Sequence, residues 1–575
     1  MSVTPQGKRS EYEGPPRVVI LGGGYGGVYA ALGLKKAIRK GQISLSLISR
    51  DNFFLYQPML AEVVSGSVEP PHIVNPIRRL LPSANFRQAE VEAVDAQNRD
   101  VIIRYPGTHA HYDRIPYDHL IIAVGSSTDL SNVPGMTEHA FPFRTLGDAF
   151  ALRNHLISVI ERAEVENNAE EKAELLTFVV VGGGYTGVEV AAEINSFVRE
   201  AARDYPNVSP GDVRVVLLQG SGRILPELNE NQAAFSHRVM EKRGIEIRLG
   251  SRIKDAAVQR AVLNDGQEIA TRTIVAAIGS SPNRLLETVP GSRDSRGRLV
   301  VDETLSVPEH SGIWAVGDCA AVPDLLQGGT TPPTAQYALR QGRHVAKNIL
   351  AGIKGGRPSP FSYKSRGVFV PLGRFSAAGD VMGFQISGFP AWWLYRTYYL
   401  YQLPRLERKL KVVIDWTLEC IFRRDIVRLD STGSQGVSRA HYDAGETVFR
   451  EGGPTRNLYV VLEGRVGIIS HGDGVEKQVA ELGPGDFFGE RSLLQGSRHS
   501  ASARALTAVD LMVMSGADFT ALTGASTQFD QLLKDVMRKR SGISEQAVVD
   551  GLSQEGSEGH EGQADPTSRQ EGHDI

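Results

Sequence analysis

The sequence predicts an α/β fold built around two dinucleotide-binding units of the Rossmann type, followed by an all-β domain. Two glycine-rich loops of the same pattern, GxGxxG, carry the first part of this prediction. Each loop follows a short apolar run that is typical of a buried parallel strand and precedes a helix-like stretch, at residues 18–27 and 178–187. The second part rests on residues 441–525, where short apolar runs alternate with glycine turns.

The three glycines of each loop have separate tasks. The first allows the tight turn, the second lets the backbone approach a pyrophosphate, and the third lets the helix pack closely on the strand. The helix N-terminus then offers free N–H groups to a negative ligand. One such loop is weak evidence, but two predict a bound flavin dinucleotide (FAD) and a nicotinamide dinucleotide that reduces it. The glycines expected at these sites are Gly22, Gly24 and Gly27 in the first loop and Gly182, Gly184 and Gly187 in the second.

From residue 17 onward, apolar runs and helix-like stretches alternate. The predicted strands are 45–48, 120–125 and 312–318 in the first unit and 213–218 and 273–279 in the second, and residues 147–172 form a linking helix. Because 312–318 return to the first unit, one dinucleotide domain is inserted within the other. The predicted limits are a flexible leader 1–16, an FAD domain in two parts (17–172 and 296–375), an inserted NAD(P)H domain 173–295, an aromatic and basic region 376–430, a linker 431–440, an all-β domain 441–540 and a disordered tail 541–575.

Composition narrows the classes of function. A formal net charge of −3 over 575 residues gives no case for nucleic-acid binding. Cys319 and Cys420, the only cysteines, form no CxxC pair, which argues against a disulfide redox centre and favours a reducing compartment. No apolar stretch reaches the ~18–20 residues of a membrane-spanning helix. We therefore expect a cytoplasmic protein, peripheral on the cytoplasmic face of a membrane if it contacts one, and no metal site.

Residues ~15–430 resemble the type II NADH dehydrogenases, single-chain NADH:quinone oxidoreductases that carry FAD and do not pump protons. Four stretches carry the resemblance beyond the two loops: FFLYQPML at 53–60, NPIR at 75–78, AVGD at 315–318 and PPTAQYALRQG at 332–342. The last is similar to the family's AQxAxQQG stretch near the flavin and the quinone. The resemblance implies electron transfer from NADH through FAD to a membrane quinone.

The resemblance also suggests site residues. Asp318 is placed to accept hydrogen bonds from the ribityl or ribose hydroxyls of FAD, and its alternative role is a helix N-cap. Gln336 and Gln341 are expected at the isoalloxazine edge or the quinone, with a solvated helix face as the alternative. Glu189 lies two residues after the second loop, in the first turn of its helix, and is expected to carry protons to the quinone. The alternative is a carboxylate that only stabilises the positive N-terminal end of the helix. Gly125 and Ala335 complete the expected FAD contacts and Gly279 those of NAD(P)H.

Two positions depart from the family pattern. The acid that usually grips the FAD ribose is replaced by Ser49, with Asp51 two positions on. In the nicotinamide unit the corresponding position is Gln219, and Arg223 lies close in sequence. A carboxylate there would bond the 2′-hydroxyl and repel a 2′-phosphate, which a neutral amide does less. We therefore predict that NADPH is tolerated beside NADH.

Residues 389–424 combine aromatic, apolar and basic side chains. Leu406, Leu410, Val413 and Ile421 fall near one face of the predicted second helix, with Arg and Lys elsewhere. Interfacial helices have this composition, which predicts a lipid-docking surface. The alternative is a helix that faces the core or a second copy of the chain in a homodimer.

Residues ~441–540 resemble a cyclic-nucleotide-binding domain, whose jelly-roll fold is all β. The resemblance rests mainly on GDFFGERSLL at 485–494 and implies that Gly489 and Glu490 contact a cyclic nucleotide, Glu490 at the ribose 2′-hydroxyl. His499 occupies the place of the family's phosphate-binding arginine, with Arg498 just before it. A neutral imidazole cannot form the bidentate pair of a guanidinium. Binding of a cyclic nucleotide and a ligand-free regulatory or dimerisation role both stay open.

The leading interpretation is an FAD enzyme that passes electrons from NAD(P)H to a membrane quinone, with a nucleotide-sensor-like C-terminal domain. One alternative is a soluble flavoprotein reductase with a non-quinone acceptor. The other is a redox and cyclic-nucleotide signalling protein. The absence of an acid–base triad fits the leading interpretation, because in flavin chemistry the protein supplies mainly binding, orientation and electrostatics.

Overall fold

Two five-stranded parallel sheets lie at the centre of the first part of the chain. In the computed structural model, residues 14–106, 111–257, 259–308, 310–364, 367–381, 383–428, 438–453, 457–472, 475–490 and 499–516 are described. Residues 1–13 of the predicted leader, most of the predicted linker, Arg498 and the predicted tail lie outside them. The chain divides into two compact units, 1–429 and 430–575.

The first sheet has the order β21-β9-β1-β2-β5, and all its described pairings are parallel. Its strands are β1 (Arg17–Leu21), β2 (Ser44–Ser49), β5 (Asn85–Gln88), β9 (His119–Ile122) and β21 (Ile313–Ala315). All but one of the residues of β1 are buried, because helices cover both faces of a doubly wound sheet. The return of β21 to this sheet after residue 300 confirms the predicted insertion of one unit within the other.

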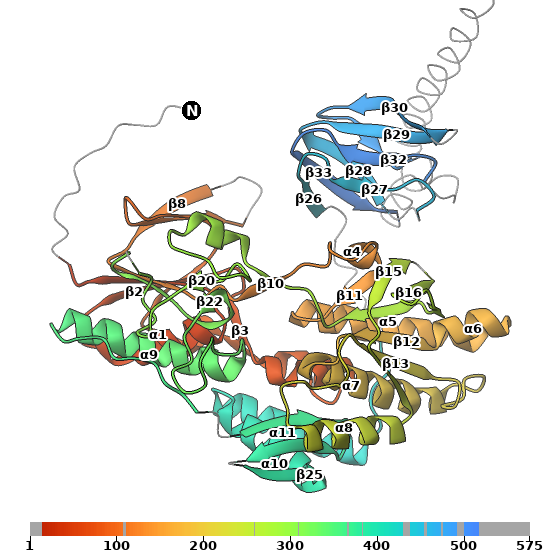
Figure 1. Cartoon of the computed structure of the whole chain (residues 1–575), viewed down its shortest axis with the longest axis horizontal. Helices are drawn as coiled ribbons and strands as arrows, with labels where there is room; N and C mark the ends of the chain where they lie inside the picture. Colours follow the sequence, from red (N-terminus) through yellow and green to blue (C-terminus); the bar gives the residue numbers. More distant parts are fainter. Residues whose placement is uncertain are drawn as a thin grey trace, which may run out of the picture. The chain divides into compact units, whose positions relative to one another are not determined.

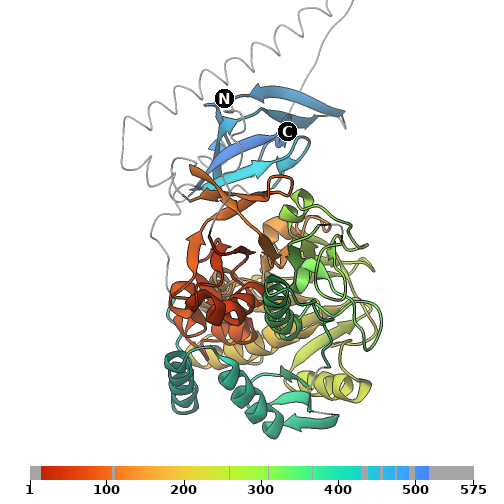
Figure 2. The same ribbon diagram turned by 90° about the vertical axis from the view of Figure 1, so that its left-hand side faces the viewer.

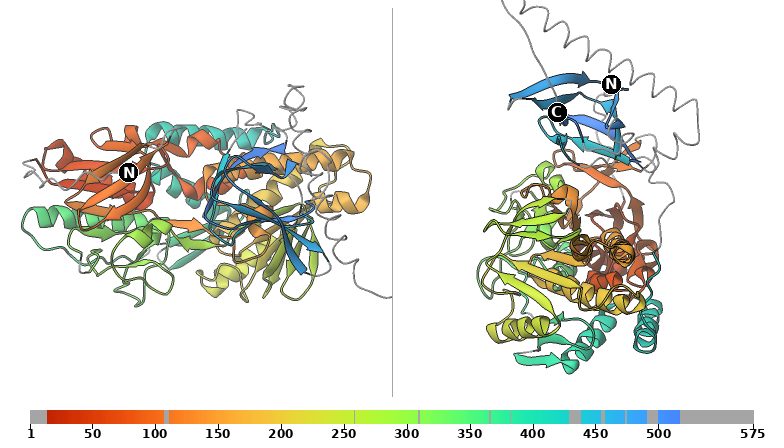
Figure 3. Two further views of the ribbon diagram at one scale, coloured as in Figure 1. Left: turned by 90° about the horizontal axis from the view of Figure 1, so that it is seen from above. Right: turned by 90° about the vertical axis from the view of Figure 1, so that its right-hand side faces the viewer.

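The second sheet repeats this arrangement with the order β11-β18-β12-β13-β14. Its strands are β11 (Ala140–Pro142), β12 (Thr177–Val181), β13 (Arg214–Gln219), β14 (Ile245–Leu249) and β18 (Thr273–Ala276). The edge strand β11 precedes residue 173, so the second sheet draws on chain that the sequence assigned to the first domain. The predicted linking helix is two helices, α5 (Leu146–Val165) and α6 (Ala169–Leu175), separated at Asn168, whose side chain caps α6. Figure 3 shows the two sheets side by side in the first unit.

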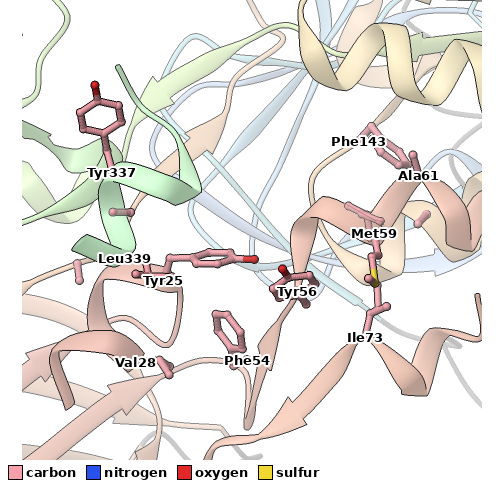
Figure 4. Close-up of a cluster of buried hydrophobic side chains, with 14 of the residues drawn as sticks. Tyr25, Val28, Phe54, Tyr56, Met59, Ala61, Ile73, Phe143, Tyr337 and Leu339 are labelled. Carbon is pink, nitrogen blue, oxygen red and sulfur yellow. The ribbon is translucent and has the colours of Figure 1, made fainter. Parts of the chain in front are cut away.

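Helices α1 (Tyr25–Arg39) and α9 (Ala335–Ile353) pack tightly beside the first sheet (Figure 1). A Cβ atom on Gly342 would lie 2.3 Å from the carbonyl oxygen of Gly26, and one on Gly33 would lie 2.8 Å from the Cβ of Ala346. Small residues therefore set the close crossing of these helices. Figure 4 shows Tyr25, at the start of α1, among Phe54, Tyr56 and Leu339. The Tyr25 and Phe54 rings meet edge to face at 4.9 Å.

A short sheet and two helices complete the first unit. The antiparallel strands β23 (Gly367–Pro371), β24 (Ala377–Val381) and β25 (Phe384–Gly388) lead into α10 (Phe389–Gln402) and α11 (Leu406–Ile421). Figures 1 and 2 show both helices on the same side of this unit. β23 belongs to the predicted FAD domain (296–375), whereas β24 and β25 belong to the predicted aromatic region (376–430). One sheet therefore crosses the predicted boundary between them.

The second unit consists of two four-stranded antiparallel sheets, as predicted for an all-β domain. Their orders are β26-β33-β28-β31 and β27-β32-β29-β30. The strands are β26 (Ser438–Tyr442), β27 (Thr447–Phe449), β28 (Asn457–Glu463), β29 (Val466–Gly472), β30 (Val475–Leu482), β31 (Phe487–Phe488), β32 (Ser502–Ala505) and β33 (Val509–Ser515). Val461, Val466, Ala503 and Leu511 are among the apolar side chains of its buried core.

Candidate functional site

The first glycine loop follows β1 and leaves open space at its centre. Gly22 has φ +107°, and a Cβ there would lie 2.3 Å from the Ala123 carbonyl oxygen, so only glycine fits. A Cβ on Gly27 would lie 2.0 Å from the Gly22 oxygen, but one on Gly24 would find no atom within 4 Å. Since no side chain caps α1 at Gly24, the loop offers backbone N–H groups and room to a pyrophosphate, which fits FAD.

The second glycine loop, after β12, has the same geometry. Gly182 has φ +108°, and a Cβ on Gly187 would lie 1.6 Å from the Gly182 oxygen. Around Gly184 the nearest atom to an added Cβ is a Glu227 carboxylate oxygen at 3.9 Å, and no side chain caps α7 (Tyr185–Ala201) there. This loop fits the pyrophosphate of a nicotinamide dinucleotide.

Both loops lie at the point where the strand order of their sheet reverses. β1 lies between β9 and β2, and β12 lies between β18 and β13, and ligands of open α/β sheets bind at such points. Gly125 and Gly279 follow the neighbouring strands β9 and β18 with φ of +65° and +84°. A Cβ on Gly279 would lie 2.4 Å from the Asp129 carbonyl oxygen, so this glycine also allows the backbone at Asp129 to pass closely.

Asp318 lies in a 3-10 turn, Gly317–Cys319, after β21 has ended, and not at the strand end as predicted. The cap of that turn is Val316, so the N-cap alternative for Asp318 is wrong. The Ser126 hydroxyl donates to the Asp318 carboxylate at 3.4 Å, and an Arg144 guanidinium nitrogen lies 3.9 Å from it. Burial raises the pKa of Asp318, and Arg144 opposes this. Neither Ser126 nor Arg144 was predicted, because nothing local marks them.

The Gln341 side chain stabilises the 3-10 turn that contains Asp318. Its side-chain oxygen accepts the Gly317 N–H at 2.8 Å, and its nitrogen donates to the Thr331 hydroxyl at 3.0 Å. Gln341 is 2% exposed, so the alternative of a solvated helix face is wrong for this residue. The structure thus gives Gln341 a task in positioning the turn, and its direct contact with flavin or quinone stays a prediction.

The start of α9 faces a pocket that includes Asp318. Ala335 is the first residue of α9, and no side chain caps the helix at Thr334, so its first N–H groups are open to a ligand. The Gln336 amide donates to the Gly367 carbonyl at 3.2 Å and accepts from the Tyr363 hydroxyl at 3.3 Å. The pocket is lined by Arg298, Gly317, Asp318, Ala320, Thr331, Pro332, Pro333, Thr334, Tyr337, Ala338 and Gln341.

The last residue of the second strand of each unit, Ser49 in β2 and Gln219 in β13, lies against the glycine loop. A Cβ on Gly23 would lie 2.6 Å from the Ser49 hydroxyl oxygen, while Asp51 is exposed two residues on. The Gln219 side-chain oxygen accepts the Gly183 N–H at 2.9 Å. The Gln219 nitrogen donates to the Ser221 hydroxyl at 2.6 Å and the Arg223 carbonyl at 3.2 Å. Ser49 and Gln219 therefore lie against the two glycine loops, and their contact with a ribose stays a prediction.

Glu189 is the fifth residue of α7, beyond the first turn where the sequence placed it. It lies among Tyr185, Tyr395 and Tyr399, whose pKa values are raised chiefly by burial and in part by the Glu189 charge. Burial raises the pKa of Glu189 to about 8, and the charge of Glu62 adds to this effect. Glu189 therefore retains a proton near neutral pH, which suits a group that donates one.

The outer faces of α10 and α11 are apolar and exposed. Leu406, Leu410, Val413 and Ile421 are exposed on α11 as predicted, whereas Trp416 is buried on its other side. The further exposed apolar residues of this region are Phe389, Trp393, Tyr401, Ile414, Leu418 and Phe422. Among the described residues, no helix combines the length and apolar character needed to cross a bilayer.

In the second unit, His499 is buried and stacked on Phe449, with ring centroids 3.6 Å apart and planes 7° apart. Burial lowers the pKa of His499, so its imidazole is neutral at pH 7. Glu490 is also buried, and Gly489 has φ +90° with the Asn457 carbonyl oxygen 2.8 Å from an added Cβ. The predicted fourth residue, Arg498, is outside the described residues.

Two parallel sheets, each with an open glycine loop at its reversal point, define a flavoprotein with two dinucleotide sites. The family model described as pyridine nucleotide-disulphide oxidoreductase matches residues 16–342, and the cyclic nucleotide-binding domain model matches 439–525. The cysteines Cys319, which is buried, and Cys420, which is exposed, are both free.

Similar proteins narrow the class further. A probable NADH dehydrogenase of Dictyostelium discoideum is 31% identical over 73% of this chain and 92% of its own. The type II NADH:quinone oxidoreductase Ndh of Mycobacterium tuberculosis is 31% identical over 75% of this chain and 94% of its own. The solved structure of NDH2 from Plasmodium falciparum in complex with NADH has a TM-score of 0.66 at 20% identity, over 72% of this chain and 99% of that one, and supports the fold. The chain belongs to the type II NADH dehydrogenase family, with a cyclic-nucleotide-binding domain at its C-terminal side.

Proposed function

We propose that this protein oxidises NAD(P)H and reduces a membrane quinone through bound FAD. The observation that carries the proposal is the pair of uncapped glycine loops. In addition, Glu189 lies among the tyrosines of α10, on the side of the unit where the exposed apolar face is found. FAD, when bound, supplies a redox centre that takes a hydride and gives up two electrons. The first glycine loop, Asp318 and the start of α9 would hold it.

The decisive experiment is NADH oxidation by purified, FAD-loaded protein with menaquinone and ubiquinone analogues. Fast turnover with either quinone supports the proposal. Turnover only with a dye or a ferredoxin would favour the soluble reductase. Negligible NADH oxidation together with tight binding of cyclic AMP would favour the signalling protein.

Glu189 is proposed to donate a proton to the quinone. The geometry supports this because its carboxyl group is protonated near neutral pH and lies by Tyr395 and Tyr399. A Glu189→Gln enzyme should reduce quinone ~10²-fold or more slowly, the usual contribution of a general acid. Unchanged quinone turnover in a normally folded variant would remove this role.

The exposed apolar face of α10 and α11 is proposed to dock on a lipid surface, where a lipid-soluble acceptor is reached. Leu410→Ser and Ile421→Ser should weaken binding to vesicles that contain anionic phospholipid. Val165→Ser is the matched control, because Val165 is also an exposed apolar residue, at the end of α5 and outside this face. If the two α11 variants bind vesicles normally but abolish a dimer in sedimentation, the face belongs to a homodimer.

NADPH is proposed to serve beside NADH. Gln219 presents no carboxylate, and its amide is engaged by the loop itself. The Arg252 side chain lies close by, 2.9 Å from where a Cβ on Gly220 would be. Gln219→Glu should lower kcat/KM for NADPH about tenfold or more relative to NADH, through repulsion of the 2′-phosphate. A parent preference for NADH above ~10⁴-fold would contradict the proposal.

The C-terminal domain is proposed to bind cyclic nucleotides only weakly. Glu490 is present for a ribose hydroxyl, but neutral His499, stacked on Phe449, supplies no cation for the phosphate. Calorimetry with cyclic AMP and cyclic GMP tests this. His499→Arg should tighten binding, and tight binding by the parent would refute the proposal.

A further inference from the structure

A buried cluster of charged side chains lies where α2 (Leu60–Val64), α7, α10 and α11 meet. We call its members, Glu62, Glu193, Glu419, Arg396 and Arg424, the buried charge cluster. Arg396 lies 2.9 Å from the Glu419 carboxylate and 3.5 Å from that of Glu62. Arg424 lies 2.8 Å from Glu419 and 3.6 Å from Glu193. All five side chains are 10% exposed or less.

Three carboxyl groups share two guanidinium groups in this cluster, and Arg424 lies 3.9 Å from Glu200 as well, whereas Arg243 interacts with Glu193 from outside the cluster. Both arginines of the cluster lie closest to Glu419, whose pKa they lower despite its burial. Glu62 and Glu193 receive weaker support, and burial raises the pKa of both, that of Glu62 to about 7. A buried carboxyl group whose charge is only partly compensated favours the protonated form.

The hydrogen bonds of Glu62 leave one of its two carboxyl oxygens available to carry a proton. The Trp416 indole N–H donates to one of its oxygens at 2.7 Å. Its other oxygen is buried and has no hydrogen-bond partner among the described residues. A proton bound to this second oxygen would not be committed to a hydrogen bond with a described residue, so it could be donated to another group.

The charge of Glu62 acts through space on Glu189. Helices α2 and α7 pack against each other, and Glu189 and Glu193 lie one turn apart on α7. After burial, the charge of Glu62 is the largest influence that raises the pKa of Glu189. The charged and titratable groups around these two carboxyl groups are Glu193 and Tyr185 of α7, Tyr395, Arg396 and Tyr399 of α10, and Glu419 of α11.

Quinone reduction requires more protons than a hydride carries. NADH gives a hydride, which is two electrons and one proton. A quinol forms from a quinone, two electrons and two protons. One proton must therefore come from water for each quinone reduced. If the Glu189 carboxyl O–H breaks as a quinol O–H forms, Glu189 becomes a carboxylate and must be reprotonated.

We propose that Glu62 is a proton-relay residue that acts through Glu189, reprotonating it after each quinone has been reduced. This rests on the proposed function of Glu189. The proton leaves the unpartnered oxygen of Glu62 and binds the Glu189 carboxylate, and Glu62 then regains a proton from water. Arg396 favours the charged form of Glu62, whereas burial and the charge of Glu193 favour the protonated form.

The competing explanation is that Glu62 only anchors Trp416 and thereby α11. Two variants separate these explanations. Glu62→Gln keeps an oxygen that accepts the Trp416 N–H but removes the titrating acid. Trp416→Phe removes the anchor but keeps the acid, and loss of its N–H, which lowers the Glu62 pKa, should move that pKa upward.

The first measurement is infrared spectroscopy of the resting protein as a function of pH. A protonated carboxylic acid band should be present at pH about 6 and fade by pH about 9, since burial raises the carboxyl pKa. The part of this band that belongs to Glu62 should be missing in Glu62→Gln and retained in Trp416→Phe. An identical band in parent and Glu62→Gln would overturn the proposal without reference to turnover.

The second measurement separates the two halves of the reaction. Reduction by NADH should be equal in parent and Glu62→Gln, whereas oxidation of the reduced enzyme by excess quinone over several turnovers should be about tenfold slower and should lose its pH dependence near neutrality. Trp416→Phe should keep that dependence, displaced to higher pH. A parent-like pH profile in Glu62→Gln would overturn the relay alone. A parent enzyme that reduces no quinone would overturn the proposed function, and the relay with it.

Discussion

Replacing Gly24 by alanine separates binding of FAD from folding. A methyl group at Gly24 meets no protein atom within 4 Å, and the backbone there, at φ −84° and ψ −163°, suits alanine. The free energy of unfolding of the FAD-free protein should therefore change by less than ~1 kcal/mol. The same methyl group occupies the space that a pyrophosphate needs. If it costs ~1–3 kcal/mol, as overpacking does, FAD binds ~5–150-fold more weakly.

Gly27→Ala is the contrasting variant in the same loop. Its methyl group would lie 2.0 Å from the Gly22 carbonyl oxygen, well inside van der Waals contact, so α1 must move away from β1. The unfolding free energy of the FAD-free protein should fall by ~3 kcal/mol or more, because the clash is with backbone. Denaturant unfolding of the FAD-free proteins and titration with FAD give the two quantities. A Gly24→Ala protein that binds FAD as tightly as the parent would refute this reasoning.

Three further predictions concern stability and the cofactor turn. Arg424→Met should lower the unfolding free energy by ~3–5 kcal/mol by leaving buried carboxylates unpaired, whereas the exposed neighbour Arg423→Met should change it by at most ~1 kcal/mol in the same denaturant titration. Because Glu189 keeps a proton to a pKa of about 8 when folded, it stabilises the fold most below its ordinary pKa of 4.5, and this contribution is lost as pH rises through about 8. Glu189→Gln should flatten that part of the stability–pH curve, and an unchanged slope would contradict the shift. Gln341→Leu removes two buried hydrogen bonds of the Asp318 turn, so FAD should dissociate about tenfold faster in a fluorescence assay, and an equal rate would exclude a positioning role.

Local patterns in the sequence were sufficient for the two glycine loops and the strands before them. The constraint on Gly27 or Gly187 is a contact within one loop, so a short motif contains it completely. The all-β domain was predicted for the same reason, since turn glycines and alternating runs are local. The apolar face of α11 also followed from spacing, but its exposure did not, because a helix that faces the core has the same pattern. Predictions that needed a helix boundary were less accurate, as with Glu189 and Asp318, because caps and turns shift the ends of elements by a few residues.

Only the tertiary structure decided what surrounds the predicted site residues. The ion pair of Glu62 and Arg396 joins positions 334 residues apart, and the Trp416 hydrogen bond to Glu62 spans 354. No periodicity or motif in the sequence indicates such a pairing, so Glu62, Arg396 and Trp416 were not predicted as site residues. Gln341 likewise appeared as a candidate ligand contact, and its buried bonds to Gly317 and Thr331 became visible only once the strands and α9 were packed. The sequence determined which backbone could receive two dinucleotides, because that depends on neighbouring residues. The fold determined which carboxyl groups retain protons, because desolvation and charge act through space and not along the chain.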